Sequence, residues 1–253
     1  KQKSEKYVKF LYEKLQRKGI LEADCNKLVK TDRTTWGSCM VSCGDADAMV
    51  TGNTRHYAAT VEKLMQSVGA RENELVFGMC IFIEQGKTIV IADTNVIEYP
   101  TSEELAEMAI SASRVAKLLG LDPKVAFLSH STFGQPETDR TKRVAKAVEI
   151  LKEKKVEFIF DGEMQPDVAL NTKYKSTYSF SEVVGNANIL LMPSIHAAAI
   201  STKMLKELSR GKVIGPMLIG LAQPIEVAPL RSTSYEILNL ASIAAYSSEK
   251  IKY

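Results

Sequence analysis

Hydrophobic residues recur along this chain at two spacings, and segments of the two kinds alternate. Segments with apolar residues three or four apart predict amphipathic helices, and they are residues 4–17, 23–30, 57–68, 101–119, 139–154 and 194–208. Short apolar or β-branched runs predict buried strands, and they are residues 48–52, 74–83, 88–92, 125–128, 158–160 and 188–192. Strands that alternate with helices predict βαβ units and an α/β protein with a largely parallel sheet.

Two local signals fix the ends of these elements. Thr101 followed three residues later by Glu104 predicts a capped helix start, because each side chain can bond to the other residue's amide. Residues 84–87 separate two β-rich runs and predict an antiparallel hairpin. Residues 171–181 are polar and aromatic without a period, so we expect a loop there.

Composition narrows the class of protein and its partners. The 253 residues are 45% apolar and 25% charged, which is typical of a folded globular chain and excludes a disordered or disulfide-scaffold protein. The net charge of +3 is spread along the chain, which predicts no nucleic-acid partner. The longest uncharged stretch, residues 183–202, contains proline, asparagine, serine and histidine, so we expect no membrane span.

The four cysteines indicate a reducing environment. Neither a signal peptide nor a glycosylation sequon accompanies Cys25, Cys39, Cys43 and Cys80, and we therefore expect a cytoplasmic protein. Cys39 and Cys43 would share a helical face, but no histidine or second cysteine pair lies near them in the sequence. We interpret them as buried thiols and expect no metal site.

The segment after the predicted strand at 125–128 is the main candidate for binding chemistry. It offers hydroxyls, a histidine and a glycine ahead of a helix, at Ser129, His130, Ser131, Thr132 and Gly134. Free amides and hydroxyls near a helix N-terminus favour a phosphate or another anion. The alternative is that these hydroxyls only cap the helix.

A second candidate is the acidic segment after the strand at 158–160. Asp161, Glu163 and Asp167 are compatible with a metal site or an acid–base pair. Helix capping and turn formation are the alternative, which the absence of a neighbouring histidine favours. His56 and His196 are interpreted as structural residues.

Five stretches taken in order resemble signature segments of the phosphate acetyl/butyryl transferases, the phosphotransacetylase family. They are residues 92–94, 128–134, 161–167, 187–193 and 215–224. Residues 192–203 and 232–239 are similar to one branch, the phosphotransacetylase-like C-terminal domain of hybrid NADP-dependent malic enzymes.

The resemblance implies a two-lobe fold. Both lobes would be αβα with mainly parallel sheets, and a cleft would separate them. Residues 1–96 together with 221–253 would form the first lobe, and residues 97–220 the second. The first βα units expected before Ser4 are not in this sequence, so the first lobe would be N-terminally incomplete and Lys1 would be a cut inside a longer chain.

The resemblance also implies which residues would carry acyl transfer. Active relatives resemble one another in a Ser-Arg-Gly stretch, a following aspartate and a helix arginine, and the matching positions here are 229–231, Glu236 and Glu62. The arginine positions are therefore occupied by Leu230 and Glu62, which weakens binding of a charged acyl phosphate. Arg231, one position along, and Arg55 are the possible substitutes.

These observations lead to three hypotheses. The first is a regulatory, oligomerising domain that binds acetyl-CoA, or a related acyl-CoA, and inhibits an NADP-dependent malic enzyme whose N-terminal domain lies in the same chain. That domain would carry the NADP and the divalent metal. The second is an active phosphate acyltransferase with Arg231 and Glu236 as catalytic residues. The third is a purely structural oligomerisation domain.

The resemblance places CoA or phosphate at the predicted anion loop, at Arg231 and at a glycine–proline pair. The predicted ligand-binding residues are Ser129, His130, Ser131, Thr132, Gly134, Gly215, Pro216 and Arg231.

Overall fold

The computed structural model describes residues 2–250, which divide into two compact units. Unit 1 consists of Lys1–Val76 with Pro216–Tyr253, and unit 2 is Phe77–Gly215. Residues 77–96, which the sequence led us to group with the first lobe, belong to unit 2, because the two strands they contain, residues 77–84 and 87–92, pair inside the sheet of that unit.

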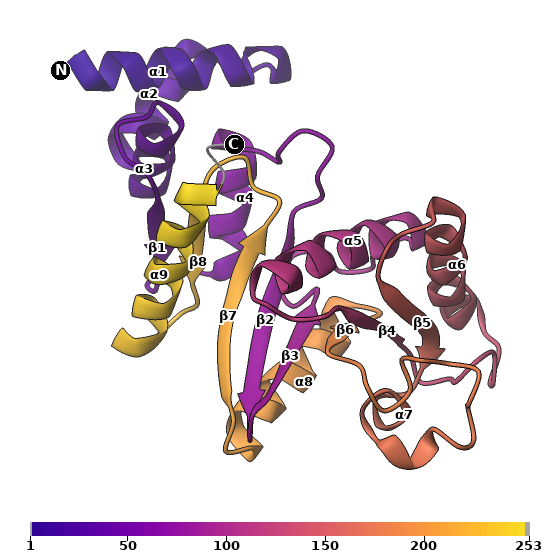
Figure 1. Cartoon of the computed structure of the whole chain (residues 1–253). Helices are drawn as coiled ribbons and strands as arrows, with labels where there is room; N and C mark the ends of the chain where they lie inside the picture. Colours follow the sequence, from indigo (N-terminus) through magenta and orange to yellow (C-terminus); the bar gives the residue numbers. More distant parts are fainter. Residues whose placement is uncertain (1, 251–253) are drawn as a thin grey trace. The chain divides into compact units, whose positions relative to one another are not determined.

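A mainly parallel sheet forms the centre of unit 2. Its strands are β2 (Phe77–Glu84), β3 (Lys87–Ala92), β4 (Lys124–Leu128), β5 (Ile159–Met164), β6 (Ile189–Leu191) and β7 (Lys212–Ile219), and the residues of β7 from Pro216 on are assigned to unit 1. The strand order is β5-β4-β6-β3-β2-β7 (Figure 1). From β5 to β3 every neighbouring pair is parallel, and β2 runs antiparallel to β3. The predicted α/β class with a mainly parallel sheet is confirmed.

Helices cover both faces of this sheet. The helices of unit 2 are α5 (Ser102–Leu118), α6 (Asp139–Lys154), α7 (Pro166–Leu170), α8 (Ile195–Leu208) and the 3-10 turn η2 (Thr172–Tyr174). α5 and α6 pack together against β4, while α7 and α8 pack into a core cluster with Leu128 and Leu190. Successive residues of β4 point to opposite faces and are all buried from Val125 on, which explains its continuous apolar sequence.

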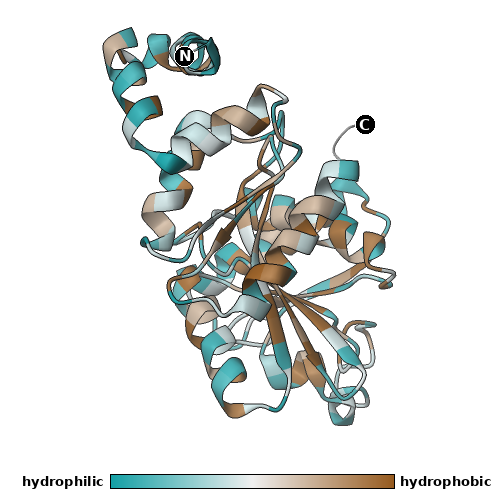
Figure 2. Ribbon diagram, turned by 90° about the vertical axis from the view of Figure 1, so that its left-hand side faces the viewer, coloured by the Kyte–Doolittle hydropathy of each residue, from teal (hydrophilic) through white to brown (hydrophobic). Residues whose placement is uncertain are grey.

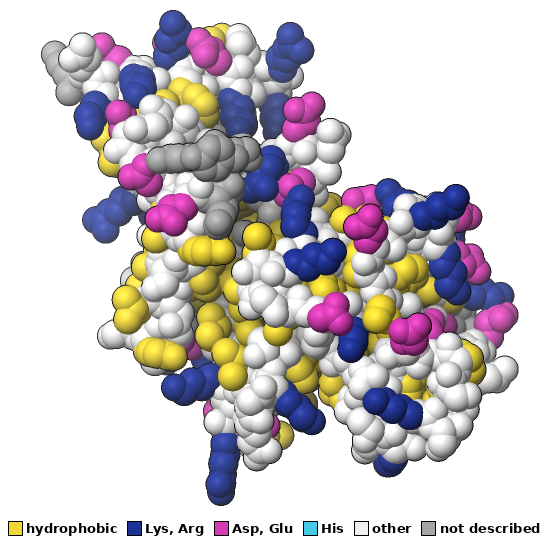
Figure 3. Space-filling model, in the orientation of Figure 1, with side chains coloured by type: hydrophobic (Ala, Val, Ile, Leu, Met, Phe, Trp, Pro, Cys, Tyr) yellow, Lys and Arg dark blue, Asp and Glu magenta, His cyan; other side chains and the backbone are white. Residues whose placement is uncertain are grey.

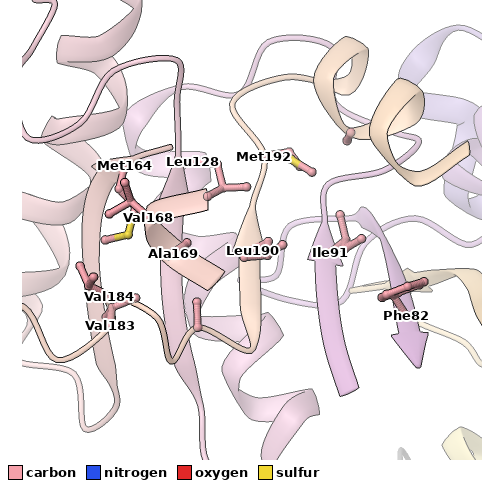
Figure 4. Close-up of a cluster of buried hydrophobic side chains, with 13 residues drawn as sticks. Phe82, Ile91, Leu128, Met164, Val168, Ala169, Val183, Val184, Leu190 and Met192 are labelled. Carbon is pink, nitrogen blue, oxygen red and sulfur yellow. The ribbon is translucent and has the colours of Figure 1, made fainter. Parts of the chain in front are cut away.

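The pictures show the same arrangement. The strands of the sheet are the most hydrophobic part of unit 2 (Figure 2). Figure 4 shows Leu128 and Met192 next to each other at the ends of β4 and β6.

Both predicted local signals are confirmed. Thr101 and Glu104 form a reciprocal capping box at the start of α5. β2 and β3 form the expected hairpin, and Gln85 and Gly86 at its tip have φ angles of 48° and 77°. Positive φ at both central residues matches the right-handed twist of the flanking strands.

Unit 1 is built from helices around a short parallel pair of strands. Its elements are α1 (Gln2–Leu15), η1 (Gln16–Lys18), α2 (Glu22–Thr31), α3 (Arg33–Ser42), β1 (Met49–Gly52), α4 (Tyr57–Ser67), β8 (Ile225–Ala228) and α9 (Ser234–Lys250). β1 pairs with β8 in parallel, with Met49 opposite Ile225. Tyr7 and Leu11 of α1 pack with Cys25 and Cys39 in a buried cluster.

The sequence pattern did not predict α3, α7, β7, β8 or α9. α3 buries Thr34, Thr35 and Ser38 alongside its apolar residues, so its buried face carries no apolar period. The predicted strand at 158–160 is also longer than expected, because β5 continues to Met164.

The charged side chains are mixed (Figure 3) and the cysteines are thiols, as predicted, but Cys43 is not fully buried. Lysines and arginines are mixed with acidic side chains over the face shown in Figure 3. None of the helices in the described part of the chain has the length and apolarity to cross a membrane. All four cysteines are free; Cys25, Cys39 and Cys80 are buried and Cys43 is half-buried.

Candidate functional site

The loop after β4 turns its donors toward a carboxylate of the protein itself. The side-chain Oγ of Ser131 donates to Oε1 of Glu163 at 2.8 Å, and the amide of Gly134 donates to the same oxygen at 2.7 Å. Ser131 is 0% exposed and Glu163 2% exposed. A buried carboxylate that accepts two hydrogen bonds has much of its desolvation cost offset. The Glu163 side chain therefore occupies two of the donors that the sequence assigned to an external anion.

The remaining loop residues tie the loop to the start of α7. Thr132 Oγ1 accepts a hydrogen bond from the amide of Gln165 at 3.2 Å, and Gln165 Nε2 donates to the carbonyl of His130 at 3.0 Å. Gly134 has a φ of 88° and open space where a Cβ would lie, so the turn needs glycine for its backbone conformation. The side chain of His130 is exposed.

The three acidic residues of 161–167 do not converge. Asp161 and Glu163 lie within β5, and Asp167 accepts a hydrogen bond from the hydroxyl of Tyr174 at 2.7 Å. The expected helix capping is wrong for the first two, since they precede the end of the strand and Gln165 occupies the N-cap of α7. Across residues 2–250, no three His, Cys, Asp or Glu side chains gather in a way that could hold a metal ion.

Sequence reasoning assigned no role to Asp93, which follows β3. Its carboxylate accepts four backbone amides, from Gly78 at 2.7 Å, Asn95 at 2.9 Å, Val96 at 3.3 Å and Ile97 at 2.6 Å. Burial raises the pKa of Asp93, and the four amides oppose this rise by favouring the ionised form. Asp93 therefore organises the loop after β3 from within.

In unit 1, the predicted site residue Arg231 follows the carboxyl end of β8, next to the residue that follows β1. The amide of Arg231 donates to the carbonyl of Asn53 at 3.2 Å, and the amide of Asn53 donates to Ala228 at 2.9 Å, so the two loops lie side by side. Ligands bind at such strand ends in parallel α/β folds. Leu230, at the expected clamp position, is 52% exposed.

Glu236 has a structural partner at the start of α9. Its Oε2 accepts hydrogen bonds from the amide and the hydroxyl of Thr233, at 2.7 Å and 3.0 Å. The Thr233 hydroxyl accepts in turn from the Glu236 amide. This reciprocal arrangement caps the helix.

The predicted substitute Arg55 is bound by a carboxylate that the sequence did not single out. Arg55 Nη1 donates to Asp32 Oδ2 at 2.6 Å, and Lys63 Nζ donates to the same oxygen. Burial by itself raises the pKa of Asp32, but hydrogen bonds from Lys63, the Thr35 amide and Arg55 outweigh it and hold that pKa well below its usual range. The only sequence signal was an aspartate three residues before Thr35, which is a helix N-cap pattern.

The predicted ligand-binding residues are divided between the two units. Ser129, His130, Ser131, Thr132, Gly134 and Gly215 belong to unit 2, and Pro216 and Arg231 belong to unit 1. Gly215 and Pro216 are consecutive residues of β7, and the boundary between the two units lies between them. Glu62 is an exposed residue of α4.

Comparison with known proteins identifies related sequences over almost the whole chain. Residues 1–245 match the phosphate acetyl/butaryl transferase family. The chain is 46% identical over 241 residues to the NADP-dependent malic enzyme of Rhizobium meliloti, covering 95% of this chain and 32% of that protein. It is 33% identical over 260 residues to the phosphate acetyltransferase of Acetivibrio thermocellus, covering 99% of this chain and 78% of that protein.

A solved structure supports the fold. The phosphotransacetylase from Streptococcus pyogenes superposes with a TM-score of 0.89 at 29% identity, covering 96% of this chain and 76% of that one. The chain thus spans 78% of the Acetivibrio thermocellus transferase and 76% of the Streptococcus pyogenes enzyme, but about a third of the length of the malic enzymes.

Proposed function

This chain belongs to the phosphate acetyl/butaryl transferase family, and from that premise we propose that it is the regulatory, oligomerising domain of an NADP-dependent malic enzyme. In this proposal it binds acetyl-CoA, or a related acyl-CoA, as an allosteric inhibitor. The observation that carries the proposal is the 46% identity to a malic enzyme over 95% of this chain. Oxidation of malate, with its NADP and divalent metal, is assigned to an N-terminal domain of the same chain.

The side chains at the clamp positions support a role without acyl transfer. Transfer between CoA and phosphate requires cationic groups at the phosphate, because charge must be neutralised as the thiolate attacks. Leu230 is apolar and Glu62 is acidic. Arg55 forms an ion pair with Asp32, and Glu236 caps α9, so both side chains already have a structural role.

Inhibition by acetyl-CoA requires two states of the malic enzyme with different affinities for the effector. A ligand shifts an equilibrium only by its differential affinity for the two states. Binding acetyl-CoA without converting it suits such a role, since the effector is not consumed.

Calorimetric titration of acetyl-CoA into this chain tests the binding step. We expect saturable heat and a rise in melting temperature, because a ligand that binds only the folded state stabilises it. Malic enzyme activity of the complete chain should fall as acetyl-CoA is added. Absence of both heat and thermal shift at millimolar acetyl-CoA would leave only the structural, oligomerising role.

The second candidate is an active phosphate acyltransferase, favoured by the 33% identity to a phosphate acetyltransferase over 99% of this chain. It would use Arg231 and Glu236 together with the loop at 129–134. Release of CoA from acetyl-CoA in the presence of phosphate, followed with a thiol reagent, distinguishes the two. Turnover well above the protein-free rate would overturn the regulatory proposal in favour of this one.

A further inference from the structure

A pocket of about 410 Å³ lies entirely within unit 2, and it extends beyond the residues that the sequence marked. It is formed where β4 and β6 end, and its lining includes Leu128 and Met192. Ser129 and His130 line it from the loop after β4, and Ser194 from the start of α8. The carboxyl ends of parallel strands are where ligands bind in sheets of this kind.

The charged side chains that line this pocket are all basic. Arg140 and Arg143 line it from α6, three residues apart and therefore on one face of that helix. His130 and His196 add two imidazoles, and no aspartate or glutamate is part of the lining. The pocket also borders the N-terminal end of α8, where the helix dipole favours negative charge.

The two arginines are held near each other without an acidic partner. Arg143 is half-buried, and its Nη2 donates to the carbonyl of Pro193 at 2.7 Å, which fixes the guanidinium at the end of β6. Its buried Nε has no hydrogen-bond partner within the described residues. Burial and the nearby charge of Arg140 lower the pKa of Arg143. Neither arginine forms an ion pair with any carboxylate in residues 2–250.

The nearby acidic side chains Glu137 and Glu98 pair with residues other than the two arginines. Glu137, just before α6, pairs with Lys142 at 2.8 Å. Glu98 lies 3.7 Å from Nε2 of His196, with both side chains largely exposed, and it is not part of the pocket lining. Within the described residues, no carboxylate therefore pairs with Arg140 or Arg143, in contrast to Arg55 with Asp32 and to the loop donors with Glu163.

We infer that this pocket is a binding site for a phosphate dianion, either free phosphate or a phosphate monoester, held by Arg140 and Arg143. A guanidinium presents paired N–H donors that match phosphate oxygens, and two of them match a double negative charge. Ser129 and Ser194 supply hydroxyls at the same wall. A monocarboxylate such as acetate carries one charge and binds more weakly.

This inference goes beyond the proposed regulatory function and does not depend on it. Acetyl-CoA carries a 3′-phosphate monoester, so it is one possible source of the group, and free phosphate is another. The two sources are separable, because dephospho-CoA lacks only that monoester.

Calorimetric titration with inorganic phosphate, against acetate at the same ionic strength, tests the site. We expect saturable phosphate binding that Arg140→Gln weakens about tenfold and Arg140→Gln with Arg143→Gln abolishes. Arg140→Gln removes a side chain with no hydrogen bond or ion pair in the described part of the chain, so folding should be unaffected. Arg210→Gln, outside the pocket, removes the same charge and should change the affinity less than twofold.

Competition identifies the source of the phosphate group. If a monoester is the natural ligand, CoA displaces phosphate and dephospho-CoA does not; if free phosphate is the ligand, neither displaces it. Phosphate affinity that is unchanged in the folded double variant, or equal to that of acetate, would overturn the inference. That result would not decide whether the chain binds acetyl-CoA, which is tested by a separate titration. If the double variant binds acetyl-CoA with the same heat as wild type, the proposed function stands while this inference fails.

Discussion

Ser131 and Glu163 are 32 residues apart in the sequence, and their side chains form a buried hydrogen bond of 2.8 Å at the carboxyl end of β4. The same Glu163 oxygen accepts the amide of Gly134 at 2.7 Å. The loop that resembles a phosphate-binding segment is thereby fastened to the neighbouring strand β5.

Replacing Glu163 measures how much these two hydrogen bonds contribute to the stability of the fold. Glu163→Ala removes the acceptor of the Gly134 amide and leaves the Ser131 hydroxyl with Ser129 Oγ at 3.1 Å as its acceptor, and a buried unsatisfied group costs about 1–3 kcal/mol. We expect Glu163→Ala to lower the free energy of unfolding by about 3 kcal/mol in urea titrations. Glu163→Gln keeps an acceptor oxygen and should lose less than half as much. Equal losses in the two variants would show that the lost charge, and not the lost acceptor, sets the cost.

Glu226 makes the stability of unit 1 depend on pH. Burial raises the pKa of this residue from 4.5 to about 8, with the Leu218 amide as its hydrogen-bond donor. The folded state then binds a proton that the unfolded state releases, so the contribution of Glu226 to stability is greatest below pH 4.5 and falls as pH rises toward 8. Glu226→Gln keeps the acceptor and removes this penalty, which is on the order of a few kcal/mol.

Thermal unfolding at pH 5 and pH 8 measures this effect. The melting temperature of Glu226→Gln should exceed that of wild type by several degrees more at the higher pH. Glu62→Gln removes an exposed carboxylate from α4 and serves as the matched control, with no change across the same range. A pH-independent difference for Glu226→Gln would mean that the folded protein ionises this residue normally.

Asp32 should contribute stability of the opposite pH dependence. Its pKa is held low by Lys63, Thr35 and Arg55 against the effect of burial, so its contribution is present above the unfolded pKa of 3.8 and is lost as pH falls below it. Asn can still cap α3, and Arg55 and Lys63 are partly exposed, so we expect Asp32→Asn to cost only about 1–2 kcal/mol at pH 7.

Urea unfolding at pH 7 and pH 3 checks this expectation. The loss in Asp32→Asn should shrink at the lower pH and in high salt. Asp122→Asn, at an exposed position, should cost nothing measurable at either pH. A loss that stays constant with pH would point to altered helix capping instead of charge pairing.

Restoring the expected phosphate clamp tests the reason proposed for the absence of acyl transfer. Leu230→Arg combined with Glu62→Arg places cations at both positions that the family resemblance assigns to arginine. Because single electrostatic contacts of this kind are worth about 10²–10³ in rate, we expect CoA release from acetyl-CoA and phosphate to rise at least tenfold.

Leu238→Arg is the matched control, since it adds an arginine at another exposed leucine of unit 1 and should not raise the rate. A folded double variant that still binds acetyl-CoA and shows no increase would mean that the two positions are not what limits transfer.

Local order was largely predictable from the sequence. The apolar period from Asp139 to Lys154 predicts α6 with both ends as the structure has them, and Thr101 with Glu104 predicts the start of α5. These features depend on residues three or four apart, whose proximity a helix guarantees. The sequence pattern did not predict α3, because its buried face carries threonine and serine and therefore shows no apolar period.

The tertiary structure decided which residues far apart in the sequence contact each other. The sequence by itself determined the α/β class, the mainly parallel sheet and membership of the family, because strand–helix alternation and ordered motifs are properties of the chain. Only the fold decided that Glu163 faces Ser131, that Asp32 holds Arg55, and that Arg140 and Arg143 line a pocket free of carboxylates. Those contacts follow from the strand order and from helix packing, which bring together side chains far apart in sequence and so leave no periodic signal along it.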